Sequence, residues 1–362
     1  MSAAGRIVAA TVLAVALAGC GSSHQHAASA PKAVSSGFAP LSFTAISEND
    51  YWVLGSALCA SGLCTAVVHT TDGGGRFSSI DAPELQNVGA PGSEATLRFA
   101  DQADGFAFVT GEGGAFYATH DGGTSWQPLL RMPSVIAFAT GGGYVYAVTA
   151  RCTSSRCTGF RFARSPVSRD AWTSSALPFT PDGPVLDLSA HGSNVWLLGT
   201  RAGQQASQSD VLARSTDAGQ KFAVGDGPCI PGLGGELAPS SATVLWAVCP
   251  TGTLAEAGRS TDGGRTFTRL HTPTELVNSA QLAPASDTAA LLSRNGATAP
   301  PLLTTDAGAT WTTPQTPPGA VFWPWVGFTD ANVGAALVQT SDDTQLWRTT
   351  DGGSRWATVE FG

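Results

Sequence analysis

The octapeptide Thr70–Phe77 (TTDGGGRF) has the pattern Ser/Thr-x-Asp-x-Gly-x-x-Trp/Phe, and this pattern recurs along the chain. The further copies are Thr119–Trp126 (THDGGTSW), Ser215–Phe222 (STDAGQKF), Ser260–Phe267 (STDGGRTF), Thr304–Trp311 (TTDAGATW) and Thr349–Trp356 (TTDGGSRW). Six copies of one spaced pattern indicate a tandem repeat of a single structural unit.

The spacing of the motif aspartates gives the number of units. Successive aspartates lie 44 to 49 residues apart, except for Asp121 and Asp217, which are separated by 96 residues. Halfway across that gap, Ser165–Trp172 (SPVSRDAW) keeps the first and last motif residues but has Val167 and Arg169 in place of Asp and Gly. We count it as a seventh, decayed copy. The mean period is then 46.5 residues, so the 322 residues from Leu41 to Gly362 hold seven units.

A period in the forties is typical of a propeller or of a helical array, and the local pattern separates the two. Each unit has short apolar runs rich in aromatic and β-branched residues, such as Tyr51–Leu54, Gly105–Val109 and Val195–Leu198. Clusters of Gly, Asp, Asn and Ser separate these runs, as expected for strands joined by turns. The sequence therefore predicts an all-β fold, a seven-bladed β-propeller of four-stranded antiparallel blades.

The motif has a mechanical purpose in such a blade. Its Ser/Thr ends the third strand, and the Asp side chain accepts hydrogen bonds from backbone N–H groups of the turn into the fourth strand. The fifth-position glycine tolerates positive φ, and the final aromatic residue packs beneath the turn. We expect the six motif aspartates to be structural, because separate metal or acid sites would need further ligands from other blades: Asp72, Asp121, Asp217, Asp262, Asp306 and Asp351.

From about residue 41 to the C-terminus the chain resembles Asp-box, or BNR, repeat proteins. Repeats of this kind occur in sialidases, sortilin-type receptors, some xyloglucan-degrading glycosidases and seven-bladed propellers of the photosystem II stability-factor type. In that superfamily the box is a signature of the fold and not an active site. The resemblance therefore implies the architecture strongly and the function weakly.

The N-terminus has the pattern of a bacterial lipoprotein signal. Arg6 precedes the apolar stretch Ile7–Ala18, and Leu17-Ala18-Gly19-Cys20 matches a lipobox. We expect residues 1–19 to be a signal peptide, Cys20 to carry lipid, 20–40 to form a flexible tether and 41–362 to form the propeller. An ordinary signal peptide or a short membrane helix is the alternative, although the stretch is shorter than the ~20 residues that a spanning helix needs. The expected location is extracytoplasmic, at the bacterial cell membrane.

The remaining cysteines are six, an even number that suits an oxidising compartment. Two pairs have only four residues between their members, so we predict the disulfides Cys59–Cys64, Cys152–Cys157 and Cys229–Cys249 out of 15 possible pairings. Zinc is disfavoured because the spacing is not that of a metal knuckle and no histidines group beside the cysteines. No metal or cofactor is expected.

Charge argues against nucleic acid as a partner. The formal net charge is −8, and Lys32 and Lys221 are the only lysines. No basic stripe is available to neutralise phosphates. We expect a monomer that contacts the membrane through the lipid on Cys20 and binds an envelope protein or a glycan.

Strand order predicts where loops gather. In each blade the turns after the first and third strands lie on one face, and the other two connections lie on the opposite face together with all three predicted disulfides. Long, stapled loops are common sites of binding. Candidate contacts there are Trp323, Trp325, Arg151, Arg201, Asp182 and Asp226, with Glu84, Arg131, Arg156, Arg294, Asp342 and Asp343 as further charged residues. The alternative for the Trp-Pro-Trp segment is packing between blades.

Three functions remain open. Sialidases need three arginines around the substrate carboxylate and a Phe/Tyr-Arg-Ile-Pro segment, which this sequence lacks; Arg98 alone is placed to project toward the axis. A pair of acids, from Glu84, Asp182 or Asp226, would allow glycoside hydrolysis if they met about 5–9.5 Å apart. We therefore favour a non-catalytic, lipid-anchored binding or assembly scaffold, with an exo-glycosidase as the alternative and a purely structural envelope protein as a third possibility.

Overall fold

The computed structural model describes residues 33–34, 37–60, 62–85, 95–110, 114–129, 132–153, 156–277, 280–293 and 300–361. The expected signal peptide, the lipidation site Cys20 and two of the charged candidates, Arg131 and Arg294, lie outside the described residues.

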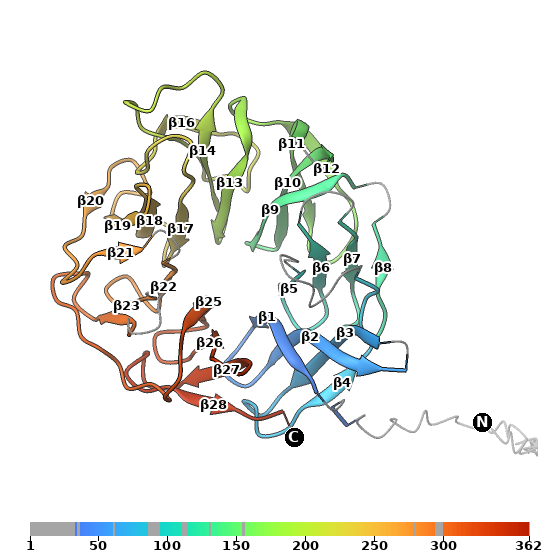
Figure 1. Ribbon diagram of the computed structural model, residues 1–362. Coiled ribbons are helices and arrows are strands. Elements are labelled where there is room, and N and C mark those ends of the chain that lie inside the picture. Colours follow the sequence, from blue (N-terminus) through green and yellow to red (C-terminus); the bar gives the residue numbers. More distant parts are fainter. Residues whose placement is uncertain are drawn as a thin grey trace, which may run out of the picture. The chain divides into compact units, whose positions relative to one another are not determined.

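The prediction of a seven-bladed β-propeller is confirmed: seven antiparallel sheets stand in a ring, each with its first strand at the axis (Figure 1). Blades 1 and 2 are β1 (Ala39–Ala45), β2 (Tyr51–Cys59), β3 (Gly62–Thr70), β4 (Ser78–Ile80) and β5 (Ala95–Phe99), β6 (Gly105–Val109), β7 (Phe116–Thr119), β8 (Gln127–Pro128). Blades 3 and 4 are β9 (Ser134–Gly141), β10 (Tyr144–Thr153), β11 (Arg156–Pro166), β12 (Thr173–Ala176) and β13 (Pro181–His191), β14 (Asn194–Arg201), β15 (Val211–Ser215), β16 (Ala223–Asp226).

Blade 5 consists of β17 (Glu236–Pro239), β18 (Leu245–Pro250), β19 (Leu254–Ser260) and β20 (Thr268–Arg269), with β21 (Leu276–Val277) beside β19. Blade 6 consists of β22 (Leu282–Pro284), β23 (Ala290–Leu292) and β24 (Leu302–Thr304). Blade 7 consists of β25 (Phe322–Phe328), β26 (Gly334–Gln339), β27 (Thr344–Thr349) and β28 (Ala357–Val359). No helix occurs among the described residues.

Blade 6 departs from the regular pattern at its outer edge. Its fourth strand is reduced to one bridge, in which Leu303 and Thr312 exchange N–H to carbonyl hydrogen bonds of 2.8 Å. Pro314 follows almost at once, and proline cannot donate to a strand ladder. Gln315 bonds instead to the motif turn of blade 7, donating to the Ser354 carbonyl at 2.8 Å.

The core lies between the sheets. The second strand of each blade carries a fully covered side chain at one equivalent position, usually aromatic: Trp52, Phe106, Tyr146, Trp196, Trp246, Leu291 and Ala335. Burial of large aromatic rings is the main source of stabilisation for such sheets, since each can remove roughly 150–250 Å² from water.

The motif turns repeat one hydrogen-bond pattern. In blade 1 the Thr70 hydroxyl donates to Asp72 Oδ1 at 2.8 Å and accepts from Gly74 N–H at 3.1 Å, while Asp72 Oδ1 accepts from Arg76 N–H at 2.9 Å. The fourth motif residue also donates to the turn between the first two strands, as Gly73 N–H does to the Asn49 carbonyl at 3.0 Å. The two kinds of turn therefore meet on one face, which we call the motif face.

The decayed copy keeps its turn with different bonds. Ser165 Oγ donates to the Arg169 carbonyl at 2.7 Å and accepts from Ala171 N–H at 2.9 Å. Val167, in the aspartate position, is buried and donates its N–H to the Gly143 carbonyl at 3.0 Å. In this turn a buried valine side chain therefore occupies the position from which an aspartate carboxylate accepts hydrogen bonds in the other six turns.

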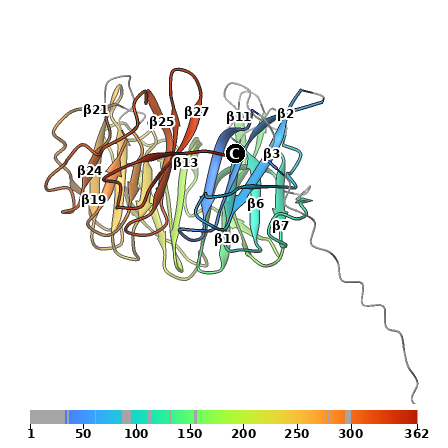
Figure 2. The same ribbon diagram turned by 90° about the horizontal axis from the view of Figure 1, so that it is seen from below.

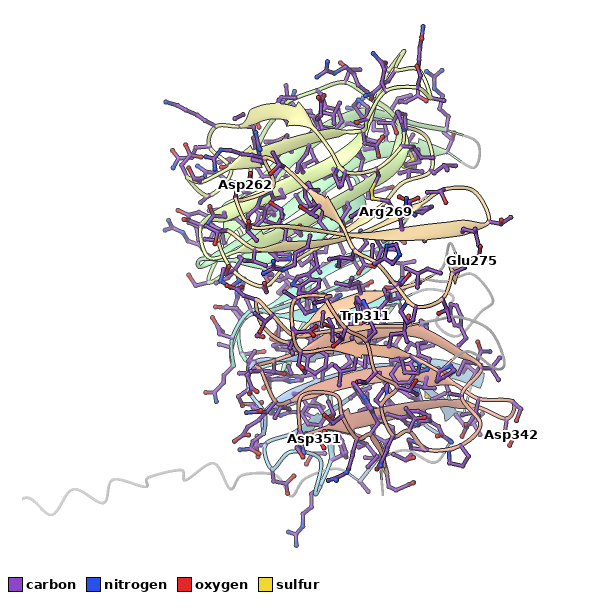
Figure 3. All side chains as sticks on the ribbon, turned by 90° about the vertical axis from the view of Figure 1, so that its left-hand side faces the viewer. Asp262, Arg269, Glu275, Trp311, Asp342 and Asp351 are labelled. Carbon is purple, nitrogen blue, oxygen red and sulfur yellow. A yellow bond between two sulfur atoms is a disulfide. The ribbon has the colours of Figure 1, made fainter. Side chains whose placement is uncertain are left out.

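The three predicted disulfides are present: Cys59–Cys64, Cys152–Cys157 and Cys229–Cys249, with Cα–Cα distances of 6.1, 4.0 and 5.0 Å. They lie at the end of the ring opposite the motif turns, which we call the disulfide face. Figure 3 shows this segregation, with the motif residues Asp262 and Asp351 at one end and Glu275 and Asp342 at the other.

Closure of the ring uses packing without an exchanged strand. All strands of blade 7 come from the C-terminal part, and β1 begins blade 1 at Ala39, two residues before the expected boundary. Phe361 packs against Phe38 and Phe77 with centroid distances of 4.8 and 4.9 Å. Figure 2 shows the blades from the side, with the described C-terminal strand lying against the first blade.

Candidate functional site: the axial cavity

The inner strand of each blade is a sheet edge, so its outward N–H groups need partners. Side chains of the preceding blade supply several of them. Ser42 Oγ accepts from Leu97 N–H at 3.0 Å, and Thr44 Oγ1 accepts from Phe99 N–H at 3.1 Å. Asp187 Oδ2 similarly accepts from Leu237 N–H at 3.2 Å. The axis of the ring is therefore lined by polar side chains.

Strand register sorts these side chains into two layers. The motif-side layer contains the inner-strand residues that pair with the seven covered core positions: Thr44, Arg98, Ala139, Ser189, Ala238, Ala283 and Gly327. The middle layer lies two residues earlier on each strand and contains Ser42, Thr96, Ala137, Asp187, Glu236, Gln281 and Trp325.

A cavity of about 250 Å³ opens on the motif face, where β1, β5, β9 and β25 end. Its walls are mainly aromatic and hydroxyl-bearing: Phe43, Thr44, Ala45, Arg98, Phe99, Thr140, Trp325, Gly327, Phe328 and Thr329. Arg98 is the one ionisable side chain among these residues. We call this space the axial cavity.

Arg98 is held by main-chain groups alone. Its Nη1 donates to the Phe43 carbonyl at 3.3 Å and to the Leu97 carbonyl at 3.0 Å. Within the described part of the chain no carboxylate forms an ion pair with it, and its Nε and Nη2 have no hydrogen-bond partner. Burial lowers the pKa of Arg98, yet a guanidinium stays charged at any physiological pH. Among the residues that the structure describes, this cation of the cavity has no counter-ion.

Trp325 forms one wall of the axial cavity because position 327 is glycine. A Cβ on Gly327 would lie 2.8 Å from Trp325 Cζ2, so the indole occupies the space that another residue would fill. On its other side the indole packs against Phe43, with a centroid distance of 5.3 Å. Glycine here permits close approach of a side chain and is not needed for a positive φ.

Two acids occupy adjacent positions of the middle layer, Asp187 in blade 4 and Glu236 in blade 5. Burial raises the pKa of Asp187 to about 7, partly opposed by the hydrogen bond from Leu237 N–H. Burial, reinforced by the charge of Asp187, raises the pKa of Glu236 to about 8. Sequence reasoning missed both residues; the available signal was an acid next to leucine on an inner strand, in Leu186-Asp187-Leu188 and in Glu236-Leu237.

The two tryptophans that were expected to be ligand contacts on the disulfide face lie elsewhere in the structure. Trp323 is 1% exposed and packs edge-on against Trp347 and Trp356, each at 5.4 Å between centroids. It therefore cannot serve as an exposed stacking surface, and its assignment as a ligand contact is wrong. Trp325 lines the axial cavity on the motif face, not a site on the disulfide face.

The charged candidates Arg151, Arg201, Asp182 and Asp226 are exposed at the disulfide face. Asp182 begins the inner strand of blade 4 and Asp226 ends its outer strand, with two strands between them. At about 4.8 Å per strand their backbones are roughly 14 Å apart. That backbone separation is larger than the about 5–9.5 Å between the carboxyl groups of a catalytic pair, and none of the cavities described below is lined by both acids.

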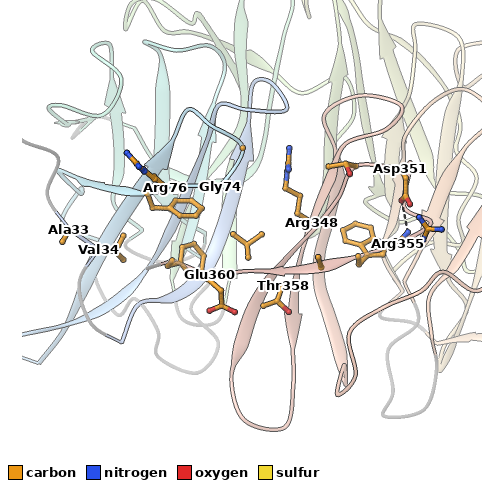
Figure 4. Close-up of a pocket in the computed structure, with 17 residues that line it drawn as sticks. Ala33, Val34, Gly74, Arg76, Arg348, Asp351, Arg355, Thr358 and Glu360 are labelled. Carbon is orange, nitrogen blue, oxygen red and sulfur yellow. Dashed lines mark hydrogen bonds between the residues drawn. The ribbon is translucent and has the colours of Figure 1, made fainter.

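A larger hollow of about 1050 Å³ lies where blade 7 meets blade 1 (Figure 4). Arg76, Arg348 and Arg355 line it together with Asp351 and Glu360. Comparable hollows of about 680 Å³ and 280 Å³ separate blades 4 and 5 and blades 3 and 4. Because sheets that radiate from an axis diverge outward, such wedges are a general product of the architecture.

Comparison with known proteins supports the fold. No family model and no curated protein sequence matches the chain. Among solved structures it is similar to YCF48 bound to D1 peptide, at 14% identity and a TM-score of 0.54 over 89% of this chain and 99% of the other. YCF48 from Cyanidioschyzon merolae is similar at 13% identity and a TM-score of 0.50, over 74% of this chain and 85% of the other.

A third solved structure, a puromycin-hydrolysing peptidase of Mycobacterium tuberculosis, is similar at 12% identity and a TM-score of 0.56. The similarity covers 90% of this chain but 53% of the peptidase. At such low identities the neighbours establish the propeller and leave the activity to be argued from the site. The described residues contain no group of three or more His, Cys, Asp or Glu side chains arranged to hold a metal ion.

Proposed function

We propose that this protein is a non-catalytic binding scaffold of the bacterial cell envelope, which holds a protein partner at the axial cavity. The observation that carries the proposal is the position of Arg98 at the axis of the ring, a cation that has no counter-ion among the described residues. Such an arrangement suits recognition, because a few polar groups in an aromatic cavity orient a ligand.

Hydrolysis is less compatible with the axial acids. A glycosidase needs one protonated and one ionised carboxyl group, which requires surroundings that move the two pKa values apart. The pKa values of Asp187 and Glu236 both move upward. Asp187 is also engaged with the inner strand of the next blade. We therefore assign this pair a structural role and retain the exo-glycosidase only as the alternative to be tested.

A protein partner is favoured over a glycan by comparison. YCF48, which shares the propeller fold, has been solved bound to a D1 peptide. A glycan remains the alternative ligand, to be separated from a protein by experiment.

The three disulfides indicate an oxidising, extracytoplasmic environment. None of the described residues forms a helix long and apolar enough to span a bilayer. We propose that lipid on Cys20 anchors a monomeric propeller to the membrane. Intact-mass analysis of the mature protein tests this, since a diacylglycerol-modified Cys20 at the new N-terminus is expected, and an unmodified terminus would remove the anchor from the proposal.

The binding function is tested by chemical crosslinking of the tagged full-length protein on intact cells of its host. Repeated enrichment of the same envelope protein is expected, and a Cys20→Ala variant serves as the control for membrane placement. The outcome that would reverse the assignment is turnover of fluorogenic glycosides by the purified protein, abolished in both Asp187→Asn and Glu236→Gln, together with the absence of any crosslinked partner.

A further inference from the structure

We propose that the axial cavity binds a peptide carboxylate, with Arg98 as the group that pairs with it. The inference deepens the proposed function and rests on it, because it names the chemical group of the partner that the scaffold recognises.

The positive charge of Arg98 favours an anionic group as the ligand. The guanidinium has donors in a fixed fork, and within the described part of the chain only Nη1 is used, by two carbonyl groups. A carboxylate is the planar acceptor that matches the two unused donors, Nε and Nη2, in bidentate fashion. An ion pair with the ligand would also offset the desolvation cost of the guanidinium, which is partly removed from water.

Neighbouring groups add to the same preference. The Thr44 hydroxyl oxygen already accepts from Phe99 N–H, so its own proton is directed to another acceptor. Thr140 and Thr329, also at the cavity, are partly exposed and contribute further hydroxyl donors. Asp187 and Glu236 belong to the middle layer and are not among the residues that line the cavity.

The dimensions favour the end of a chain. A space of about 250 Å³ is smaller than the roughly 300–1,000 Å³ of sites that enclose a whole small ligand. It accommodates one terminal group, with the partly exposed Trp325 as an apolar wall for the side chain beside the carboxylate. A main-chain terminal carboxylate and an acidic side chain share this chemistry, and the experiment distinguishes them.

The test uses the full propeller and fluorescent N-acylated tetrapeptide libraries that are randomised at the last two positions. One library has free C-termini, one is C-amidated without acids, and one is C-amidated with a single Asp or Glu. Equilibrium binding of the free-acid library is expected to be at least tenfold tighter than that of the acid-free amidated library. Tight binding of the third library would assign the carboxylate to a side chain.

Variants locate the binding. Arg98→Gln is expected to weaken binding of the carboxylate libraries at least tenfold, whereas Arg98→Lys retains part of the affinity because the charge stays without the fork. Gly327→Ala displaces the Trp325 ring without touching Arg98 and is expected to weaken binding as well. Arg164→Gln, which removes a strut between blades 3 and 4, is the control and should bind as the parent does.

Equal binding of free-acid and acid-free amidated libraries would overturn the inference, as would full affinity in a folded Arg98→Gln variant. If the Arg98→Gln variant still crosslinks the same partner on cells, the scaffold function stands but the carboxylate site does not. The two proposals can therefore fail separately.

Discussion

Arg348 of blade 7 donates a hydrogen bond from Nη2 to the main-chain carbonyl of Glu48 in blade 1 at 2.8 Å. The bond joins the last repeat to the first, where no chain connection exists. Equivalent arginines precede other motifs and make the same kind of contact with the following blade: Arg164 with the Ala218 carbonyl and Arg259 with the Asp287 carbonyl, each at 2.7 Å. One repeated residue thus links consecutive blades and also closes the ring.

Replacing Arg348 by Met is expected to lower the free energy of unfolding by about 1 kcal/mol, because a charged donor to a carbonyl is lost at a partly exposed site. Hydrogen exchange should accelerate in β1 and β28 before it does elsewhere, since the closing interface is not covalently supported. Arg164→Met removes a strut inside the continuous chain and serves as the control. Equal exchange profiles in the two variants would contradict a special role in closure.

The axial acids should make the protein less stable as pH rises. An acid whose pKa is higher in the folded than in the unfolded chain binds its proton more tightly when folded, so its contribution is lost as the unfolded state ionises. For Asp187 and Glu236 the decline runs from about pH 4 to about pH 8. Between pH 5 and pH 8 the free energy of unfolding of the parent is expected to fall by roughly 3 kcal/mol for each of the two acids. Denaturant titrations of the Asp187→Asn, Glu236→Gln double variant should show this fall largely abolished.

Asp262→Ala tests the role of the motif aspartate. Asp262 Oδ1 accepts from the N–H groups of Arg265 and Thr266, both at 2.9 Å, and from the Ser260 hydroxyl at 2.8 Å. Loss of these acceptor bonds is expected to cost about 1–3 kcal/mol in chemical unfolding. Asp226→Ala, at an exposed site of β16, should change stability little. An unchanged melting temperature for Asp262→Ala would refute the turn-locking role.

Two motif turns contain alanine where the other intact copies have glycine. Ala218 and Ala307 have φ angles of 57° and 61°, in the left-handed region that disfavours a Cβ. The double change to glycine is expected to raise the melting temperature, with a gain of about 0.5–1 kcal/mol after the entropic cost of glycine. Ala176→Gly, in the exposed strand β12, should lower it. A fall in both variants would show that the strain is not relieved.

The sequence predicts the ring far better than it predicts the site. The spacing of the motif aspartates gives the blade number, and even the decayed copy forms a turn at Ser165–Trp172. The close cysteine spacing gives the correct pairing because hairpin ends bring Cys152 and Cys157 opposite each other. Both features depend on residues that are close together in the sequence, and the repeat shows their pattern several times.

Residues at the axis are harder to assign because their neighbours come from other blades. Trp323 and Trp325 share a strand and alternate regularly in sequence, yet a register shift between Phe322 and Trp325 separates their surroundings. One ring is enclosed in the core, and the other lines the axial cavity. Asp187 and Glu236 likewise acquire their raised pKa values from burial between inner strands that are about fifty residues apart in sequence.

The central claim, that the axial cavity is the binding site of the scaffold, is tested most directly by photocrosslinking on intact cells. A photoreactive amino acid at Phe328, one of the residues that line the cavity, is compared with one at Arg201 on the disulfide face, each with Arg98 and with Arg98→Gln. The account predicts a discrete protein adduct from position 328 that disappears with Arg98→Gln. An adduct from position 201 alone, unaffected by Arg98→Gln, would contradict it.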